Sequence, residues 1–544
     1  MSAMASCTDS FMVAMADGVR LATDVYLPEP IHHSRATVLV RLPYDKTGRY
    51  TFLPDIAARM TAHGFAVVVQ DVRGKFLSEG ERVPFVNEVA DGAATLDWIV
   101  AQSWSNGVVG MMGDSYYGFT QWAAVASGHP ALRAIVPRVT GSEFFRIFAP
   151  DLVPRLPLHE WVMHTFSVPE MLESPYATMR GGRAAYELPA EAARVGDLIR
   201  DLANGHARRS LVTPALPLGR PAANLSIPAL HMGGWWDNLQ RHQLSDWHAA
   251  SRSPAGGHQF LRMGASDHED FRLHEDDEPH ANHEVDDDAL AHYLDRMTAD
   301  PIAFLDHYLH GRQGRWLAPR VRYEIANLGW QAADRWVPAD VVERQLVLGR
   351  LEAATGTADG GSLSPTVRAE RSSISWTHNP AEPVPFLIAS EWAQCEHLPD
   401  EQALHERADV ATFTTDGFGL ATDIVGHVEA ELHVSTSGPS GHIVARLLDV
   451  YPSGRARVVL EGAALVEGPQ VATRCRIDLG DTAYRMRPGH RLRLAISASC
   501  FPLYPVHPGT SAEVWDAQAA IAPATYTLLG MPGAPSVLKI TTRR

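Results

Sequence analysis

The chain has 544 residues, of which 45% are hydrophobic and 20% charged, a balance typical of globular proteins. Its net charge of −16 argues against a nucleic-acid partner or an anionic membrane surface, since both need basic patches. The four cysteines form no Cys-x-x-Cys pair, and no apolar run approaches the roughly 18 residues of a membrane span. The N-terminus lacks a signal-peptide pattern, so we expect a cytoplasmic protein without a membrane partner.

The first third of the chain alternates apolar runs with helix-like segments. The apolar runs are residues 36–43, 65–71, 107–113 and 131–137, and the helix-like segments are residues 54–64 and 88–102. Continuous apolar runs are typical of strands that are covered on both faces of a parallel sheet. The alternation therefore predicts an α/β fold for residues 1–141.

This pattern stops near residue 141 and resumes with two strand-like runs at 227–234 and 258–265. Residues 142–225 between them contain helical stretches, so we expect a helical cap over the carboxyl ends of the strands, where open α/β sheets bind ligands. The second part of the α/β core is predicted at 226–318. It includes a helix at 300–312.

From residue 319 onward the pattern changes to short alternating strands punctuated by Gly, Pro, Ser and Asp. The first of these strands is RVRYEIA, residues 320–326. Such a pattern is typical of an all-β sandwich or jelly roll. We therefore predict a C-terminal jelly-roll domain at 319–544.

Ser115 is the candidate nucleophile. It lies in GDSYYG, residues 113–118, between an apparent strand and an apparent helix. In a G-x-S-x-G turn, the glycines allow close backbone approach and the serine hydroxyl is exposed beyond the sheet. Here the second glycine, Gly118, is in sixth rather than fifth place, so the bare motif fits imperfectly.

A serine nucleophile needs a base, and the base needs an acid that orients it. Asp237 follows the strand-like run at 227–234, and His268 follows the run at 258–265. Asp237 could instead cap a helix, and His268 could belong to a solvated loop. The order Ser, Asp, His, with each residue just past a strand end, favours a catalytic triad.

Several segments together resemble the cocaine esterase, α-amino-acid ester hydrolase and X-Pro dipeptidyl-peptidase superfamily of serine hydrolases. The resemblance runs nearly end to end and includes the α/β-hydrolase fold and the jelly roll. The segments are GVRLATDVYLP, VLVRLPYDKTG, DVRGKFLSEGE, MMGDSYYGFTQW, GGWWDN, LLDVYPSGRA and PGHRLRLAIS. The elbow of this family is G-x-S-Y-x-G, so the resemblance also accounts for the sixth-place glycine.

The resemblance implies a role for each of these residues. Ser115 would be the nucleophile, His268 the general base and Asp237 the acid that orients it. The Tyr44 hydroxyl and the backbone N–H of Tyr116 would form the oxyanion hole. Preorganised donors of this kind stabilise the charge that acyl transfer builds on the carbonyl oxygen.

This sequence departs from the family pattern in two places. The family usually shows G-P-W-x-H at the base, whereas residues 264–268 read GASDH, which places Asp267 beside the base as a competing orienter. The usual Asp-Asp-x-Trp near the end of the cap is replaced by PALPLGRPAANL, residues 214–225. The resemblance therefore does not specify the acyl pocket. The substrate-binding candidates are Phe144, Trp161, Phe166, Trp235, Trp236 and Asp270.

The run from His268 to Arg296 is rich in His, Asp and Glu. A metal site is conceivable there, but we interpret the run as a solvated loop that enters a helix, with Asp residues at the helix N-terminus. A third alternative is that Glu269, Asp270 or Asp276 receives a substrate ammonium group. We expect neither a metal nor a cofactor.

The sequence thus predicts a serine hydrolase that cleaves an ester or amide of a small acyl group through an acyl-enzyme. An acyltransferase or cyclase with the same triad and a non-enzymatic binding module are alternatives. An X-Pro dipeptidyl-peptidase is less favoured, because those enzymes typically carry extra N-terminal helical domains that residues 1–17 are too short to hold. The partner is a small molecule, and a homo-oligomer is left open.

Overall fold

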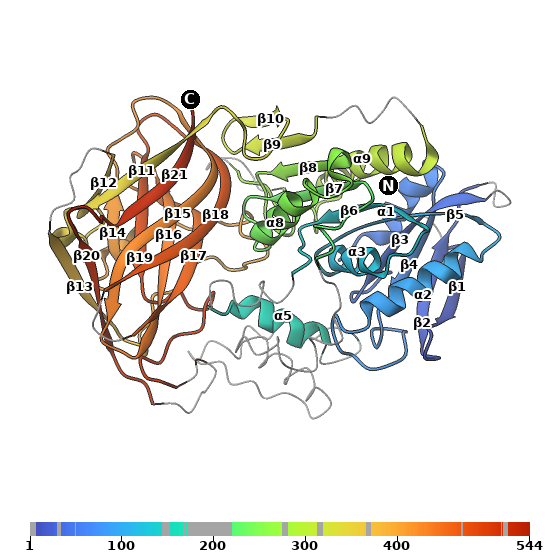
Figure 1. Cartoon of the computed structure of the whole chain (residues 1–544), viewed down its shortest axis with the longest axis horizontal. Coiled ribbons are helices and arrows are strands. Elements are labelled where there is room, and N and C mark those ends of the chain that lie inside the picture. Colours follow the sequence, from blue (N-terminus) through green and yellow to red (C-terminus); the bar gives the residue numbers. More distant parts are fainter. Residues whose placement is uncertain are drawn as a thin grey trace.

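The computed structural model has two sheets, one in each half of the chain (Figure 1). The structure describes residues 7–29, 34–48, 50–143, 153–166, 170, 220–274, 281–312, 319–365, 371–468, 472–512, 514 and 520–544. Phe144 and Asp276 lie outside the described residues, as does most of the segment predicted to form the cap.

Among the described residues, the first sheet has ten strands in the order β1-β2-β4-β3-β5-β6-β7-β8-β9-β10. They are β1 Asp9–Ala14, β2 Arg20–Tyr26, β3 Arg35–Leu42, β4 Ala66–Asp71, β5 Ser105–Asp114, β6 Leu132–Arg138, β7 Ala229–Gly234, β8 Gln259–Gly264, β9 Val321–Ile325 and β10 Gly329–Ala333. In this order, each strand from β4 through β3 and β5 to β9 is parallel to the next. The pairs β1–β2, β2–β4 and β9–β10 are antiparallel.

Helices cover both faces of this sheet, which explains the continuous apolar runs of its central strands. The helices are α1 Leu53–Ala62, α2 Glu88–Val100, α3 Ser115–Ser127, α8 Gln240–Ala250 and α9 Asp287–His310. One apolar core packs α1 and α9 against the sheet, and another packs α2, α3 and the end of α8 against the opposite face. A short 3₁₀ turn, Gly256–His258, precedes β8.

Helix α9 is longer than the predicted helix at 300–312. The Asp286 side chain caps its N-terminus by accepting hydrogen bonds from the backbone N–H groups of Asp288 and Ala289. The helix then continues through Pro301. It therefore joins the predicted helix at 300–312 to the acidic segment before it.

The strand predicted to begin the jelly roll belongs to the first sheet instead. β9 pairs in parallel with β8. Val321, Tyr323 and Ile325 are buried while Arg322 and Glu324 are partly exposed. This alternation resembles that of sandwich strands, so periodicity alone could not assign the strand to a sheet.

The second sheet is antiparallel at most pairings and forms a C-terminal β domain. Its order is β13-β20-β15-β21-β11-β12-β14-β19-β16-β17, with β18 paired to β15. The strands are β11 Val341–Gly349, β12 Gly361–Ser364, β13 Ser372–His378, β14 Ala411–Thr414, β15 Thr422–Thr436, β16 Ser440–Val450, β17 Ala456–Glu467, β18 Thr473–Met486, β19 Arg491–Ser497, β20 Ala524–Gly530 and β21 Val537–Arg543. Two 3₁₀ turns, Leu351–Ala353 and Gln402–Glu406, join them.

Helix α5, Leu156–Phe166, lies between the two sheets (Figure 1). Its first residue contacts the β domain directly. The backbone N–H of Leu156 donates a hydrogen bond to the carbonyl oxygen of Leu503 at 3.0 Å. Its last turn packs against residues of the α/β core. The helix therefore connects the β domain to the edge of the sheet that carries the candidate site.

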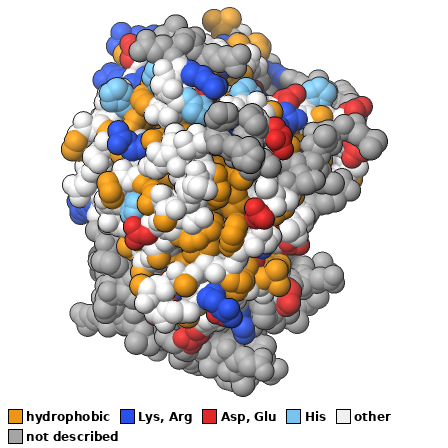
Figure 2. All heavy atoms as spheres, turned by 90° about the vertical axis from the view of Figure 1, so that its right-hand side faces the viewer, with side chains coloured by type: hydrophobic (Ala, Val, Ile, Leu, Met, Phe, Trp, Pro, Cys, Tyr) orange, Lys and Arg blue, Asp and Glu red, His pale blue; other side chains and the backbone are white. Residues whose placement is uncertain are grey.

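Figure 2 views the end of the molecule that lies on the right in Figure 1, and hydrophobic side chains gather across its middle. Strand β1 is the edge strand of the first sheet, and its Phe11 and Met12 side chains are exposed. Phe11 packs on Trp98 of α2, with ring centroids 5.3 Å apart. No described helix is both long and apolar enough to cross a bilayer.

Candidate active site

Ser115 is the first residue of α3, directly after β5, and its backbone is left-handed with φ 52°. A non-glycine residue in this region is strained and marks a sharp turn. A Cβ added at Gly113 would lie 2.2 Å from the Tyr117 ring, and one at Gly118 would lie 2.6 Å from Thr140. Both glycines are therefore required by the close packing of the turn.

Neighbouring strands hold the turn in place. The Thr140 hydroxyl, just past β6, donates to the carbonyl oxygen of Ser115 at 2.7 Å. The Asp114 carboxylate receives two hydrogen bonds from the Arg138 guanidinium, at 2.8 and 2.6 Å. These contacts fix the backbone on both sides of the serine nucleophile candidate.

Asp237 and His268 meet as the sequence predicts. The His268 imidazole Nδ1 lies 2.8 Å from Asp237 Oδ1, and both side chains are buried. Burial by itself lowers the pKa of His268, but the hydrogen bond that the imidazole donates to Asp237 and the negative charge of that carboxylate outweigh it, so the pKa is raised. Since Nδ1 faces the acid, Nε2 is the nitrogen left for proton transfer.

Gly234 allows the two loops to meet. A Cβ at Gly234 would lie 2.1 Å from the carbonyl oxygen of Ser266, in the loop that carries His268. The backbone N–H of Trp236 donates to that same oxygen at 3.0 Å. The glycine in GGWWDN thus permits the backbone contact that brings the acid beside the base.

Tyr44 follows β3, at the same edge of the sheet as Ser115. Its hydroxyl oxygen accepts a hydrogen bond from Trp161 Nε1–H at 2.8 Å, and the Ser115 side chain is close enough to lower its pKa. Burial raises the pKa of Tyr44 well above its usual value even though both contacts oppose the shift. The phenol therefore remains protonated and can donate to an oxyanion.

The Tyr116 side chain makes contacts away from Ser115, so the part of Tyr116 beside the serine is its backbone. The Tyr116 hydroxyl donates to Glu88 Oε1 at 2.8 Å and accepts from the backbone N–H of Phe85 at 2.8 Å. Its backbone N–H lies in the first turn of α3, where N–H groups have no partner within the helix. That N–H directly follows the serine in the chain.

Asp267 does not compete for the base. Its carboxylate accepts the backbone N–H of Phe271 at 2.9 Å and that of Cys395 at 2.7 Å. Burial raises the pKa of Asp267 well above its ordinary value. Asp267 therefore connects the loop that carries His268 to the β domain. Of the two acids, only Asp237 contacts the imidazole.

Asp270 was predicted to bind substrate, but it forms ion pairs with arginines. Arg296 contacts it at 2.7 Å, and Arg138 approaches it within 3.9 Å. Neighbouring Glu269 instead accepts from the Tyr50 hydroxyl at 3.3 Å. Within the described residues, no group of three or more His, Cys, Asp or Glu side chains could hold a metal ion.

The predicted aromatic candidates divide into two groups. Trp161 and Phe166 of α5 pack against Tyr116, with centroids 5.8 and 5.6 Å apart, and so lie at the site. Trp235 and Trp236 are buried in the core shared with the β domain, where their indole N–H groups donate to the carbonyls of Glu324 and Val458. The predicted substrate contact of these two residues stays a prediction.

Trp392 is a site residue that sequence reasoning missed. Its ring contacts the His268 imidazole edge-on, with centroids 4.8 Å apart, and its carbonyl accepts the backbone N–H of Glu269 at 3.1 Å. It belongs to the β domain, far along the chain. Residues 264–268 contain no tryptophan, and the indole beside His268 comes from another segment of the chain.

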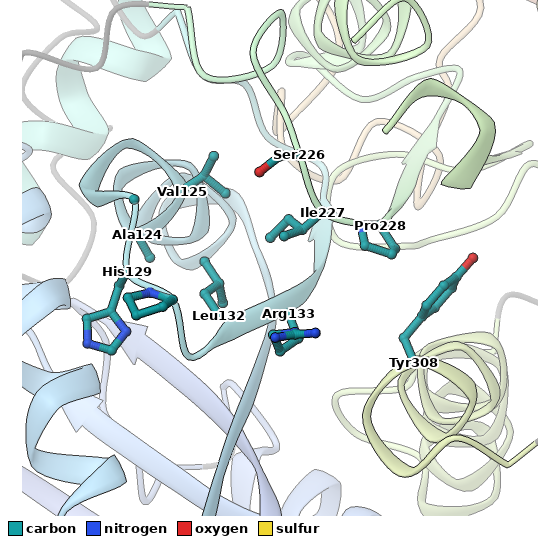
Figure 3. A pocket seen from close by; sticks show the side chains of 11 residues that line it. Ala124, Val125, His129, Leu132, Arg133, Ser226, Ile227, Pro228 and Tyr308 are labelled. Atoms are coloured by element: carbon teal, nitrogen blue, oxygen red, sulfur yellow. The ribbon is translucent and has the colours of Figure 1, made fainter. Parts of the chain in front are cut away.

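A separate pocket of about 390 Å³ lies at the opposite edge of the sheet (Figure 3). It is lined by Val125, His129, Leu132, Arg133 and Tyr308, among others. Leu132 begins β6, whereas Ser115, Asp237 and His268 all follow strand ends. This pocket is therefore distinct from the candidate active site.

A parallel α/β sheet with a serine at a strand–helix turn and an Asp–His pair at two nearby strand ends defines a serine hydrolase of the α/β-hydrolase class. The family model described as X-Pro dipeptidyl-peptidase (S15 family) matches residues 17–270, and that of the X-Pro dipeptidyl-peptidase C-terminal non-catalytic domain matches residues 315–539. The chain belongs to the superfamily of serine hydrolases that includes cocaine esterase, α-amino-acid ester hydrolase and X-Pro dipeptidyl-peptidase.

Relatives extend over nearly the whole chain. Cocaine esterase from Rhodococcus sp. (strain MB1 Bresler) is 29% identical over 92% of both chains. An α-amino acid ester hydrolase structure is 24% identical with a TM-score of 0.79, covering 100% of this chain and 98% of that one. An aminopeptidase from a marine sediment Thaumarchaeota archaeon has a TM-score of 0.80 at 21% identity and the same coverages.

These matches confirm the predicted α/β-hydrolase fold followed by a C-terminal β domain, and they confirm that the protein is a serine hydrolase. The jelly-roll topology and the remaining domain boundaries stay predictions. The catalytic roles of Ser115, Asp237 and His268 also stay predictions.

Proposed function

We propose that the protein is a serine esterase or amide acylase that acts on a small acyl group through an acyl-enzyme. The observation that carries this proposal is the 2.8 Å contact between His268 and Asp237, at the sheet edge where Ser115 meets the Tyr44 hydroxyl. A base, an orienting acid, a nucleophile and an oxyanion donor are the groups that acyl transfer requires.

The proposed first half-reaction forms the acyl-enzyme. Ser115 Oγ attacks the substrate carbonyl carbon while His268 Nε2 accepts its proton. The negative charge moves to the carbonyl oxygen, which receives hydrogen bonds from the Tyr44 hydroxyl and the Tyr116 backbone N–H. Collapse of the tetrahedral intermediate expels the alcohol or amine, which takes the proton from the imidazolium.

The second half-reaction regenerates the enzyme. His268 accepts a proton from water, and the resulting oxygen nucleophile attacks the acyl carbon. The second tetrahedral intermediate collapses and releases the carboxylic acid, and the Ser115 oxygen takes the proton from the His268 imidazolium. In both steps Asp237 stabilises the imidazolium through its contact with Nδ1.

The alternatives share this chemistry and differ in the partner molecules. An X-Pro dipeptidyl-peptidase is supported by the two matching family models, and an ester substrate is supported by the cocaine esterase relative. An acyltransferase or cyclase would replace water with another nucleophile. We favour hydrolysis of esters because the cocaine esterase relative matches the chain over 92% of its length.

The test combines active-site labelling with a substrate panel. A fluorophosphonate probe should label the wild-type protein at Ser115 and leave Ser115→Ala unlabelled. The panel comprises p-nitrophenyl esters, aminoacyl esters and an X-Pro p-nitroanilide, with product analysis in the presence of competing amines. Absence of labelling at Ser115 would remove the proposed mechanism, and preferential turnover of the anilide would favour the peptidase.

A further inference from the structure

Trp161 lies in the middle of α5 and reaches across to the α/β core. Its indole Nε1–H donates to the Tyr44 hydroxyl oxygen at 2.8 Å. The Tyr44 oxygen is the same atom that faces Ser115. A side chain from the segment between the two halves of the core thus touches the candidate oxyanion donor directly.

The direction of this hydrogen bond matters chemically. A phenol has one hydrogen to donate, and the indole N–H is a donor only. Because Trp161 donates to the Tyr44 oxygen, the phenol hydrogen must point away from the indole. The contact with Ser115 also lowers the pKa of Tyr44, so it too is made to the phenol oxygen. The hydrogen bond from Trp161 also acts to lower the pKa of Tyr44, which makes the phenol a stronger donor.

The indole is held by aromatic neighbours from three segments. Its ring centroid lies 5.8 Å from that of Tyr116, 6.2 Å from Phe85 and 5.9 Å from Phe166. These residues come from α3, from the loop before α2 and from the end of α5 itself. The ring therefore has little freedom to move away from Tyr44.

Helix α5 is in turn anchored at both ends by buried cations. Arg155, just before the helix, contacts Glu391 at 2.7 Å and Glu461 at 2.8 Å, both in the β domain. At the other end, Lys75 of the α/β core donates to the carbonyls of Thr165 and Glu170. The two halves of the molecule thus fix opposite ends of the helix that carries Trp161 (Figure 1).

We propose that Trp161 is a positioning residue for the oxyanion hole, which orients the Tyr44 hydroxyl toward the reacting carbonyl, and that α5 transmits this constraint from the β domain. This inference rests on the proposed function and differs from the substrate contact predicted for Trp161. It assigns the β domain a part in catalysis through Arg155 and α5.

The test is a double-mutant cycle on a small ester such as p-nitrophenyl acetate, which is too small to need an extended acyl pocket. Trp161→Phe removes the N–H and keeps an aromatic ring. We expect kcat to fall about 3- to 10-fold, the effect of one hydrogen bond, with KM changed less than twofold. Tyr44→Phe should lower kcat by roughly 100- to 1,000-fold.

The double variant decides the question. If Trp161 acts through the Tyr44 hydroxyl, adding Trp161→Phe to Tyr44→Phe should cause no further loss of kcat. A loss by the same factor in both backgrounds would overturn the proposal, as would an unchanged kcat for Trp161→Phe alone. A rise in KM at constant kcat would assign Trp161 to substrate binding instead.

Two further measurements distinguish a positioning role of Trp161 from misfolding of the variants and from failure of the proposed function. Replacing Trp161 with 3-benzothienylalanine keeps the shape of the indole and removes only its N–H, and it should reproduce the kcat of Trp161→Phe. Fluorophosphonate labelling of wild type tests the proposed function independently. Labelling of Ser115 together with an additive cycle would reject the role of Trp161 and retain the hydrolase.

Discussion

Trp392 of the β domain packs against the imidazole of His268, with ring centroids 4.8 Å apart and planes inclined by 67°. The base is therefore covered by a side chain from the other half of the molecule. Since the general acid delivers its proton to the departing group, the wall beside His268 is the surface that a leaving group would meet. Under the proposed mechanism, the β domain would therefore line the leaving-group side.

The first prediction follows from that contact. Trp392→Ala should lower kcat/KM for aryl esters by about 10-fold, because an aromatic contact and its buried area are lost, and it should affect methyl esters much less. Trp392→Phe, which keeps a ring, is the matched control and should retain most of the activity. Steady-state kinetics on paired aryl and methyl esters measure the difference, and equal losses for both would argue against a leaving-group wall.

The second prediction concerns the pH dependence of kcat/KM. His268 must be neutral to accept a proton, and contact with Asp237 raises its pKa, so activity should be lost as pH falls through that raised value. Asp237→Asn removes the negative charge that stabilises the imidazolium. We expect its residual activity to be lower by 10³- to 10⁴-fold and its acidic limb to move to lower pH.

The measurement is the pH–rate profile of both proteins from pH 4 to 9. Asp267→Asn is the control, because Asp267 binds backbone N–H groups and does not contact the imidazole. An acidic limb that stays in place in Asp237→Asn, or that moves in Asp267→Asn, would contradict the assignment of Asp237 as the orienting acid.

Much of the candidate site could be predicted from the sequence because its parts are local. Ser115, Asp237 and His268 each follow an apolar run, and the ends of parallel strands share one edge of a sheet. The glycines at 113, 118 and 234 lie where a Cβ would clash. Strand ends, tight turns and chain order are all encoded within a few residues.

The contacts between distant segments could not be predicted in this way. Trp392 and Trp161 reach the site through tertiary packing, for which local periodicity gives no signal. The packing of the Trp235 and Trp236 rings into the core shared with the β domain likewise gives no signal in the local sequence. β9 was misassigned because one buried face gives the same alternation in either sheet.

The third prediction compares two helical glycines. A Cβ at Gly118 in α3 would lie 2.6 Å from Thr140, whereas the nearest atom to one at Gly92 in α2 is 3.5 Å away. Gly118→Ala should destabilise the protein by about 1–3 kcal/mol through overpacking. Gly92→Ala should be neutral or stabilise it by about 0.5–1 kcal/mol, because alanine favours helix.

Thermal and denaturant unfolding of the two variants measure these changes. Gly118→Ala should also reduce the rate of fluorophosphonate labelling, since Thr140 holds the carbonyl of Ser115. Equal stability of the two variants would show that the packing around α3 relaxes, and that Gly118 is not needed for the turn.

The fourth prediction concerns the buried anchor of α5. Arg155→Met removes the cation that contacts Glu391. Burial raises the pKa of Glu391, and the charge of Arg155 partly offsets that rise. Without the arginine, that pKa should rise further above its unfolded value, so folding should become less favourable as pH rises above the unfolded pKa of about 4.3. We expect a loss of about 3–5 kcal/mol near pH 8 and a smaller loss near pH 5.

The control for this anchor is Arg155→Met combined with Glu391→Gln, which removes the carboxylate that would be left unpaired. The double variant should recover part of the lost stability and should show a smaller pH dependence, because no titrating group remains at position 391 while Glu461 still lacks its contact with Arg155. Denaturant unfolding at pH 5 and pH 8 makes the comparison. A single variant that is equally stable at both pH values would mean that water or another cation compensates the charge of Glu391.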